Sequence, residues 1–364
     1  MTFEEARAAF PVLERYAYLN AGSVGPLARR TQDALAAAEQ DELVHGRATW
    51  RYFERMLEAR GRLRAALAAE IGVEPELMSL TTSTTEGCRI VLAGLELGPD
   101  DEIVTTDAEH FGLLGPVHLS GARVRVAALR DRPAAESLEA ILAEVGPQTK
   151  LLAVSHVLWI NGHVLPMDKL RDAVSVPILV DGAQSVGAIP VDAVPFDFYT
   201  VSGQKWLCGP APSGGLYVKD PDRLSVALPS YFSQARYEPD GRFEPRDGAQ
   251  RFDPGWIPVP YLEGLLAALD ELPEWRFERS RQTAERCREL LLDLGCDVVT
   301  EPGHSNLVSW RWDGDTHATA LALGEDGVHI RDLPGTGLLR ASCGYWTSEG
   351  DLTRLVESLA GSSR

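Results

Sequence analysis

The sequence predicts an α/β protein, with a large domain on a mainly parallel sheet and a smaller α+β domain after it. Its 364 residues exceed the size at which one hydrophobic core stops growing, so we expect two domains. From about residue 50 onward, short apolar runs alternate with helical patterns, which is typical of parallel strands joined by helices. After about residue 265 this alternation gives way to a different pattern.

The elements of the large domain follow from local periodicity. Residues 50–72 repeat apolar side chains at three- and four-residue spacing, which predicts a helix ending at Gly72. Residues 77–97 predict a strand, a polar turn and a helix. Further buried strands are predicted in "EIVTTDAEH", "RVRVAAL", "KLLAVSHV", "PILVDGAQ" and "FDFYTVSG", with helices such as "AAESLEAILAEVG" and "MDKLRDAV" between several of them.

The C-terminal part predicts fewer strands and longer helices. A long helical segment from Tyr261 to Leu294 comes first. It leads to a strand "NLVSWRW", a helix "THATALALGED", strands "GVHIRD" and "GLLRASC", and a last helix "SEGDLTRLVESL". This order is that of a small α+β domain.

Composition excludes some classes of partner and site. The net charge of −18 disfavours nucleic acid and anionic membranes, because like charges repel. The five cysteines show no C-x-x-C spacing, so we expect neither a disulfide framework nor a metal site. The start "MTFEEARAAF" is acidic and amphipathic, so we expect no signal peptide, and no apolar run approaches the ~20 residues that a spanning helix needs. We therefore expect a cytoplasmic protein with no membrane contact.

Polar side chains collect where the predicted strands end. They are "TSTTEG" at 82–87, "DAEH" at 107–110, "SH" at 155–156, "DGAQ" at 181–184 and "SGQK" at 202–205. Each alone has an ordinary explanation: Asp at a strand end often caps a helix, and Ser83 with Glu86 forms a capping box. In a parallel sheet, however, all five would meet at one edge, which is where open α/β sheets bind ligands.

The residues at this edge match the chemical needs of pyridoxal 5′-phosphate. Lys205 follows an apolar strand and precedes Trp and Leu, so burial favours its neutral, nucleophilic amine. Asp181 would hold the pyridine nitrogen protonated from a nearby strand. Thr84 and Thr85 begin a helix whose free N–H groups can bind phosphate. The sequence contains no dinucleotide-binding, P-loop or H-E-x-x-H zinc motif.

The chain resembles the class V aminotransferase family of pyridoxal-phosphate enzymes, which includes cysteine desulfurases, selenocysteine lyases and isopenicillin N epimerase. The motifs "TTSTTEG", "SHVLWINGHVLP", "LVDGAQSVGAIPVD" and "SGQKWLCGPAPSGGLYV" carry the resemblance, which covers almost the whole chain. It implies a fold-type I enzyme with a seven-stranded type of sheet, and a homodimer with active sites near the subunit interface. It also implies an N-terminal arm at 1–20 packing on the small domain, a large cofactor-binding domain at 21–265 and a small domain at 266–364.

The resemblance also implies residue roles. Lys205 would bind the cofactor covalently, Asp181 would pair with the pyridine nitrogen, and Gln184 would approach the phenolic oxygen. His110 would stack on the ring, and Arg340 would bind the substrate α-carboxylate, which Arg can grip with two parallel hydrogen bonds. The residues expected to hold the phosphate are Thr84, Thr85, Ser202 and Gln204.

Three positions depart from the family pattern. Trp159 stands where desulfurases often carry Asn. Trp256 replaces the Thr that in relatives reaches the partner's phosphate, so the sequence leaves open whether a partner subunit contacts the phosphate here. The segment 332–337, "DLPGTG", lacks the persulfide-forming cysteine of desulfurases, and Cys343 and Cys208 are poorly placed to replace it.

The reaction type stays open at this stage. We favour an aminotransferase-type reaction on an amino acid, with a C–S lyase that eliminates at Cβ as the second choice and an epimerase as the third. A non-catalytic protein that retains the cofactor is the alternative from another class, and the presence of Lys205, Asp181 and Arg340 argues against it. The sequence does not identify the amino-acid substrate.

Overall fold

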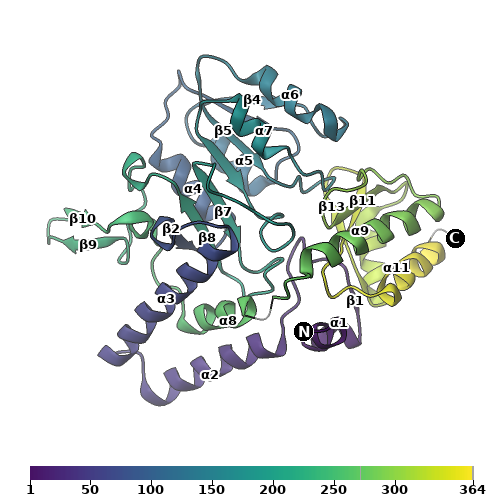
Figure 1. Ribbon diagram of the computed structural model, residues 1–364, viewed down its shortest axis with the longest axis horizontal. Coiled ribbons are helices and arrows are strands. Elements are labelled where there is room, and N and C mark those ends of the chain that lie inside the picture. The colour runs from purple at the N-terminus through teal and green to yellow at the C-terminus, as the bar shows by residue number, and fades with distance from the viewer. Residues whose placement is uncertain (271, 363–364) are drawn as a thin grey trace.

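The computed structural model describes residues 1–270 and 272–362 and confirms the α/β class. A seven-stranded sheet forms the centre of the large domain (Figure 1). Its strands, in spatial order, are β2 (Met78–Thr81), β8 (Gly214–Val218), β7 (Phe198–Ser202), β6 (Ile178–Asp181), β5 (Thr149–Ser155), β3 (Glu102–Thr106) and β4 (Arg123–Ala127). Strand β8 runs antiparallel to both neighbours, and the remaining pairs are parallel.

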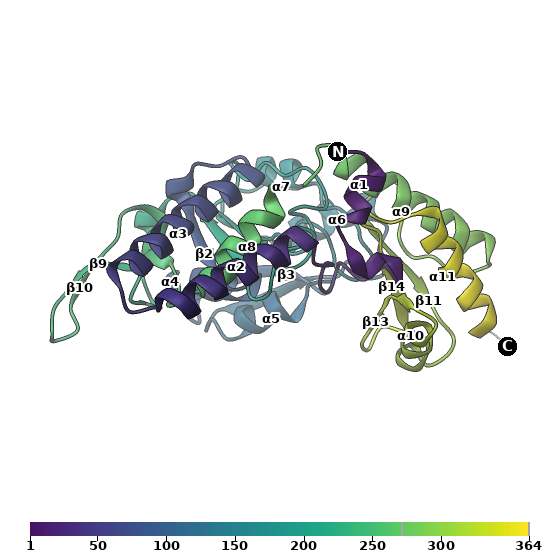
Figure 2. The ribbon, with the colours of Figure 1, turned by 90° about the horizontal axis from the view of Figure 1, so that it is seen from below.

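Helices cover both faces of this sheet because its strands are apolar on both sides. Leu151 packs with the face covered by α4 (Thr84–Gly94) and α5 (Phe111–His118), whereas Leu152 packs with the opposite face. That opposite face is covered by α3 (Trp50–Glu70), α6 (Ser137–Glu144), α7 (Met167–Ala173) and α8 (Val259–Leu269). Helix α2 (Arg29–His45) lies along α8 at the outside (Figures 1 and 2).

The C-terminal residues form a second body beside the large sheet (Figure 1). Its antiparallel sheet has the order β11 (Leu307–Arg311), β14 (Leu338–Ser342), β13 (Arg331–Leu333). Around it lie α9 (Arg276–Asp293), α10 (Thr316–Glu325) and α11 (Glu349–Ser362). These residues build their own hydrophobic cluster, centred on Trp310 and Leu355.

The N-terminal segment packs on this second body (Figure 2). Strand β1 (Ala17–Tyr18) pairs parallel with β12 (Val328–His329). Arg7, in α1 (Phe3–Ala8), forms an ion pair of 2.6 Å with Asp351. The arm expected at 1–20 and the domain limits 21–265 and 266–364 stay our proposal.

One sequence expectation was wrong, and several elements were missed, helices α2 and α5 among them. The helical segment expected from Tyr261 to Leu294 is two helices, α8 and α9, because Pro273 between them cannot donate to a helix and clashes with its preceding turn. Strand β8 was not predicted, and neither was the projecting hairpin of β9 (Gln234–Tyr237) and β10 (Phe243–Pro245), although Pro-Asp-Gly at 239–241 signals its turn. Short 3-10 turns complete the chain: η1 (Pro11–Glu14), η2 (Pro75–Leu77), η3 (Ala134–Glu136), η4 (Pro221–Arg223) and η5 (Gly248–Phe252).

In the part of the chain that the structure describes, none of the helices combines the length and apolar character needed to cross a bilayer.

Candidate active site

The carboxyl ends of β6 and β7 place the central pair of predicted residues. Asp181 is the last residue of β6, and Ser202 is the last residue of the neighbouring parallel strand β7. Lys205 lies in the turn that follows β7, where the amide of Cys208 donates to the Lys205 carbonyl at 3.1 Å. Both residues therefore lie at the sheet edge where the sequence placed them.

The Lys205 amine is shifted towards its neutral form. Burial lowers its pKa from 10.5 to about 8, the positive charge of Arg340 adds to this effect, and the negative charge of Asp181 opposes it. A lysine with this pKa is a far better nucleophile at neutral pH than one on the surface.

The Asp181 carboxyl group is 3% exposed and only partly satisfied by the protein. Its Oδ1 accepts hydrogen bonds from the Ala183 amide at 2.9 Å and the Thr200 hydroxyl at 3.5 Å. Within the described residues its Oδ2 accepts none. A buried carboxylate with one open oxygen fits a ligand that presents a protonated ring nitrogen.

The helix α4 begins at this edge and offers an anion site. Ser83 caps the helix by accepting from the Glu86 amide at 3.2 Å, as predicted, but the Glu86 carboxylate turns to Thr82 instead of closing a capping box. The half-buried Thr84 and Thr85 are the first two helical residues. Their free N–H groups and the helix dipole favour a bound phosphate.

Two buried polar atoms near this helix end lack partners among the described residues. They are the hydroxyl of Ser202, at the end of β7, and Oε1 of Gln204, in the turn before Lys205. Buried polar groups are nearly always hydrogen-bonded in folded proteins, so the Ser202 hydroxyl points to a ligand that can accept from it. Both residues belong to the set that the sequence assigned to the phosphate, but on Gln204 only Nε2 could donate to a phosphate oxygen.

His110 faces the same centre from the loop after β3. Its Nδ1 accepts from the Gly112 amide at 3.0 Å, which assigns the neutral ring with its hydrogen on Nε2. Burial lowers its pKa, and the charges of Lys205 and Arg340 lower it further against the opposing effect of Asp181. These electrostatic effects show that His110, Asp181, Lys205 and Arg340, which are distant in sequence, lie near one another.

Arg340 enters the site from β14 of the small domain. It is 2% exposed, its Nη1 donates to the Trp159 carbonyl at 2.7 Å, and its Nε has no partner among the described residues. Burial lowers its pKa to about 9, and the Arg331 charge contributes. A Cβ at Gly22 would lie 2.7 Å from Arg340 Nη2, so only glycine leaves the guanidinium its place. A buried cation with free donors is suited to a carboxylate.

Trp159, which departs from the family pattern, stands between these groups. Its ring meets His110 edge-on, with ring centroids 5.1 Å apart, and its carbonyl holds Arg340. Its buried Nε1–H has no partner in the described part of the chain. The indole therefore brings a donor to the position where desulfurases often carry an amide.

Gln184 is more constrained than the sequence suggested. Its Oε1 accepts from Trp206 Nε1 at 2.9 Å, and its Nε2 donates to the Gly22 carbonyl at 2.8 Å. One N–H of the amide remains for the expected contact with the phenolic oxygen. That role stays a prediction.

Sequence reasoning missed the importance of Glu109, although it quoted the residue beside His110. Glu109 is 3% exposed and accepts from Thr106 Oγ1 at 2.8 Å and from the amide and hydroxyl of Ser155 at 2.9 and 2.5 Å. Burial raises its pKa to about 7, and the nearby Asp181 charge acts in the same direction. It ties the His110 loop to β5, beside Asp181. The only feature of the sequence that could have indicated this role is the position of Glu109 just after a predicted strand.

The two cysteines that the sequence considered for persulfide chemistry, Cys208 and Cys343, are both buried. Cys208 and Cys343 are 2% and 0% exposed and pack in hydrophobic clusters. The segment 332–337 carries no sulfur. Within residues 1–270 and 272–362 no group of three or more His, Cys, Asp or Glu side chains is arranged to hold a metal ion.

Comparison with known proteins identifies the family. The family model described as aminotransferase class-V matches residues 33–344. The chain belongs to the class V aminotransferase family. Its cofactor is pyridoxal 5′-phosphate, as the sequence predicted, and the open Asp181 oxygen and the unpartnered Ser202 hydroxyl fit that group.

Relatives within the class V family carry different activities. The chain is 28% identical to isopenicillin N epimerase of Streptomyces clavuligerus, with 98% of this chain and 97% of that protein covered. It is 31% identical to a cysteine desulfurase of Haloferax volcanii over 76% of this chain and 66% of the relative. The solved complex of the cystine C–S lyase C-DES with its product cysteine persulfide is 29% identical, with a TM-score of 0.89 and coverage of 96% and 99%.

Proposed function

We propose that this protein is a pyridoxal-phosphate-dependent C–S lyase that eliminates sulfur from an amino acid without forming a persulfide on its own cysteine. The observation that carries the proposal is a complete Cα-activating set, Lys205, Asp181 and Arg340, in a site with no exposed thiol. The likeness to C-DES over nearly the whole chain supports it. The aminotransferase-type reaction favoured by the sequence stays an untested alternative.

Each proposed role rests on a position in the structure. Arg340 would hold the substrate carboxylate with its free donors and so fix the direction of the Cα–H bond. The Lys205 Nζ, with its pKa lowered to about 8, would take the Cα proton. Asp181 would keep a positive charge on the ring nitrogen through its open oxygen. When bound, the cofactor withdraws the electron pair left by that proton.

The remaining residues would orient the ring and its phosphate. Thr84, Thr85, Ser202 and Gln204 would bind the phosphate, His110 would cover the ring, and Gln184 would donate to the phenolic oxygen. Sulfur would then leave directly as sulfide or thiol, because Cys208 and Cys343 are buried and cannot carry it out.

Epimerisation is the second candidate, favoured by two relatives that align along the chain. Besides the Streptomyces protein, isopenicillin N epimerase of Amycolatopsis lactamdurans is 30% identical with 94% of both chains covered. Epimerisation shares the proton abstraction at Cα and differs only in returning the proton to the other face. A homodimer and a cytoplasmic location stay predictions.

An amino-acid panel that includes cysteine and cystine tests the proposal. Elimination releases sulfide or thiol together with ammonia and a keto acid. Transamination gives a keto acid that keeps its β-substituent and releases no ammonia, and epimerisation gives only the opposite enantiomer. Sulfur release that needs Lys205 but survives replacement of Cys208 and Cys343 by Ala supports the lyase, and product of either other kind without sulfur release contradicts it.

Covalent attachment is tested separately. Borohydride reduction and peptide mapping should place the cofactor on the peptide that contains Lys205, and Lys205→Ala should remove the label. A spectral change on adding amino acids is expected of a working site, and its absence with every amino acid would favour a non-catalytic cofactor-binding protein.

A further inference from the structure

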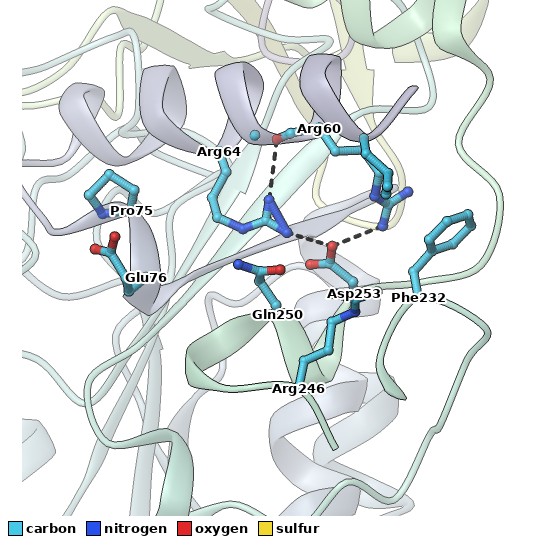
Figure 3. A pocket seen from close by; sticks show the side chains of 10 residues that line it. Arg60, Arg64, Pro75, Glu76, Phe232, Arg246, Gln250 and Asp253 are labelled. Carbon is cyan, nitrogen blue, oxygen red and sulfur yellow. Dashed lines mark hydrogen bonds and ion pairs between the residues drawn. The ribbon is translucent and has the colours of Figure 1, made fainter. Parts of the chain in front are cut away.

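A second polar cavity lies beside the edge strand β2, away from the residues of the candidate active site. It has a volume of about 360 Å³ and is lined by α3, η2, η5 and the segments that flank the β9–β10 hairpin (Figure 3). No residue of its lining belongs to the proposed cofactor site. A cavity of this size can hold a small organic molecule.

Its floor is a buried cluster with excess positive charge. Asp253 Oδ2 accepts from Arg60 Nη2 at 2.9 Å and from Arg64 Nη2 at 2.6 Å. The three side chains are at most 7% exposed. Asp253 Oδ1 is already bonded to Ser79 Oγ at 3.1 Å and the Leu80 amide at 3.0 Å. One carboxylate therefore serves two buried guanidinium groups, and a buried charge normally requires its own partner.

The two arginines differ in how well the protein satisfies them. Arg60 also approaches the carbonyls of Pro254 and Gly255, both at 3.4 Å, and lies over the Phe232 ring at 4.3 Å. Arg64 donates from Nη1 to the Arg60 carbonyl and from Nη2 to Asp253. Its buried Nε has no partner among the described residues. This unsatisfied donor belongs to a side chain that lines the cavity.

Two further side chains at the wall are available to a ligand. Arg246 and Gln250 lie around Arg64 and Asp253 in Figure 3, and within the described chain no side-chain hydrogen bond or ion pair occupies either. Burial lowers the pKa of Arg60, Asp253 opposes this effect, and the charges of Arg64 and Arg246 lower the pKa further. Glu76 is exposed at the rim and forms no ion pair within the described residues.

We propose that this cavity binds a small monocarboxylate, held by Arg246 and the Gln250 amide beside the positive cluster of Arg60 and Arg64. Three arginines against Asp253 and Glu76 leave one positive charge on the lining, which a carboxylate neutralises. A phosphate dianion would leave excess negative charge beside Asp253. Planar guanidinium donors match a carboxylate, and Leu57 and Phe232 offer apolar walls for the rest of the molecule.

Occupancy would stabilise the segment that carries Trp256. Arg60 approaches the carbonyls of Pro254 and Gly255, directly before Trp256, whose side chain is 62% exposed. A bound anion would relieve the repulsion among the three arginines and so tighten the Asp253 cluster that holds this segment.

Thermal denaturation of the cofactor-loaded protein in sodium acetate tests the site, against sodium chloride at the same ionic strength. Near-saturating acetate should raise the melting temperature of the wild type by an amount on the order of 2 °C. Arg246→Ala and Gln250→Leu should lose this rise, each variant being compared with its own melting temperature in chloride. Arg242→Ala is the matched control, because Arg242 lies on the exposed hairpin and pairs with Asp240.

Acetate could also bind to Arg340 in the candidate active site, so the same measurement is repeated on the Arg340→Ala variant. The acetate rise should persist in Arg340→Ala if the cavity is responsible. The proposal is overturned if acetate does not raise the melting temperature of the wild type. It is also overturned if the rise is lost in Arg340→Ala or survives in Arg246→Ala. Stabilisation by inorganic phosphate but not by acetate would overturn the assignment to a carboxylate.

Discussion

The protonation of Lys205 controls how fast the apoprotein can capture its cofactor, because only the neutral amine can bond to the aldehyde. With a pKa of about 8, in place of 10.5, roughly 9% of Lys205 is neutral at pH 7, against roughly 0.03% of an unshifted lysine. This is a gain of roughly 300-fold in reactive amine. The capture rate should therefore rise about tenfold per pH unit below pH 8 and level off above it.

Two substitutions should move this midpoint in opposite directions. Arg340 lowers the pKa of Lys205, so Arg340→Ala should shift the midpoint to higher pH. Asp181 raises that pKa, so Asp181→Asn should shift it to lower pH. Arg242→Ala is a suitable control, because it removes an exposed arginine of the β9–β10 hairpin that does not contribute to the Lys205 shift.

The assay mixes apoprotein with pyridoxal phosphate at a series of pH values, stops samples with borohydride and quantifies the labelled Lys205 peptide. Lys205→Ala gives the blank. A rate that keeps rising tenfold per unit to about pH 10 would show an unshifted lysine and refute the reasoning. A shift of the same sign in Arg340→Ala and Asp181→Asn would refute the assignment of its electrostatic causes.

Three further outcomes are expected. Asp181→Asn should reduce turnover by about 100-fold or more with unchanged circular dichroism, because loss of an ion-pair partner in a dry site costs several kcal/mol; wild-type turnover would contradict its role. Arg340→Lys should raise the KM for the amino acid about tenfold or more, since Lys cannot make two parallel bonds to a carboxylate, and an unchanged KM would argue against that contact. Light scattering should give twice the 39.7 kDa of one chain, and a monomer at micromolar concentration would count against the homodimer.

The order of elements and the centre of the candidate site could be predicted from local sequence. Apolar runs of strand length alternating with helical periodicity specify a parallel α/β sheet, and chain order then places the strand ends at one edge. Asp181 and Lys205 were found this way because Asp181 ends the buried strand β6 and Lys205 lies in the turn after the buried strand β7. The cofactor followed from the chemistry of these residues and from the family motifs, which the family match confirms.

Packing between distant segments decided the rest. The sequence suggested Arg340 only through resemblance, and the structure shows how the Trp159 carbonyl and the absence of a side chain at Gly22 make room for it. It also shows the double engagement of Gln184. The break between α8 and α9 was local and readable from Pro273, so missing it was an error of interpretation.

The buried charges are what only the tertiary structure could reveal. Glu109 and Asp253 look like ordinary surface acids in the sequence, yet each is buried and accepts several hydrogen bonds from other segments. Periodicity states which face of a helix or strand is buried, but the partner that lies across that face depends on the whole chain. Arg60 and Arg64 lie one helical turn apart on α3, and only folding brings Asp253 to both of them and opens a cavity at their side.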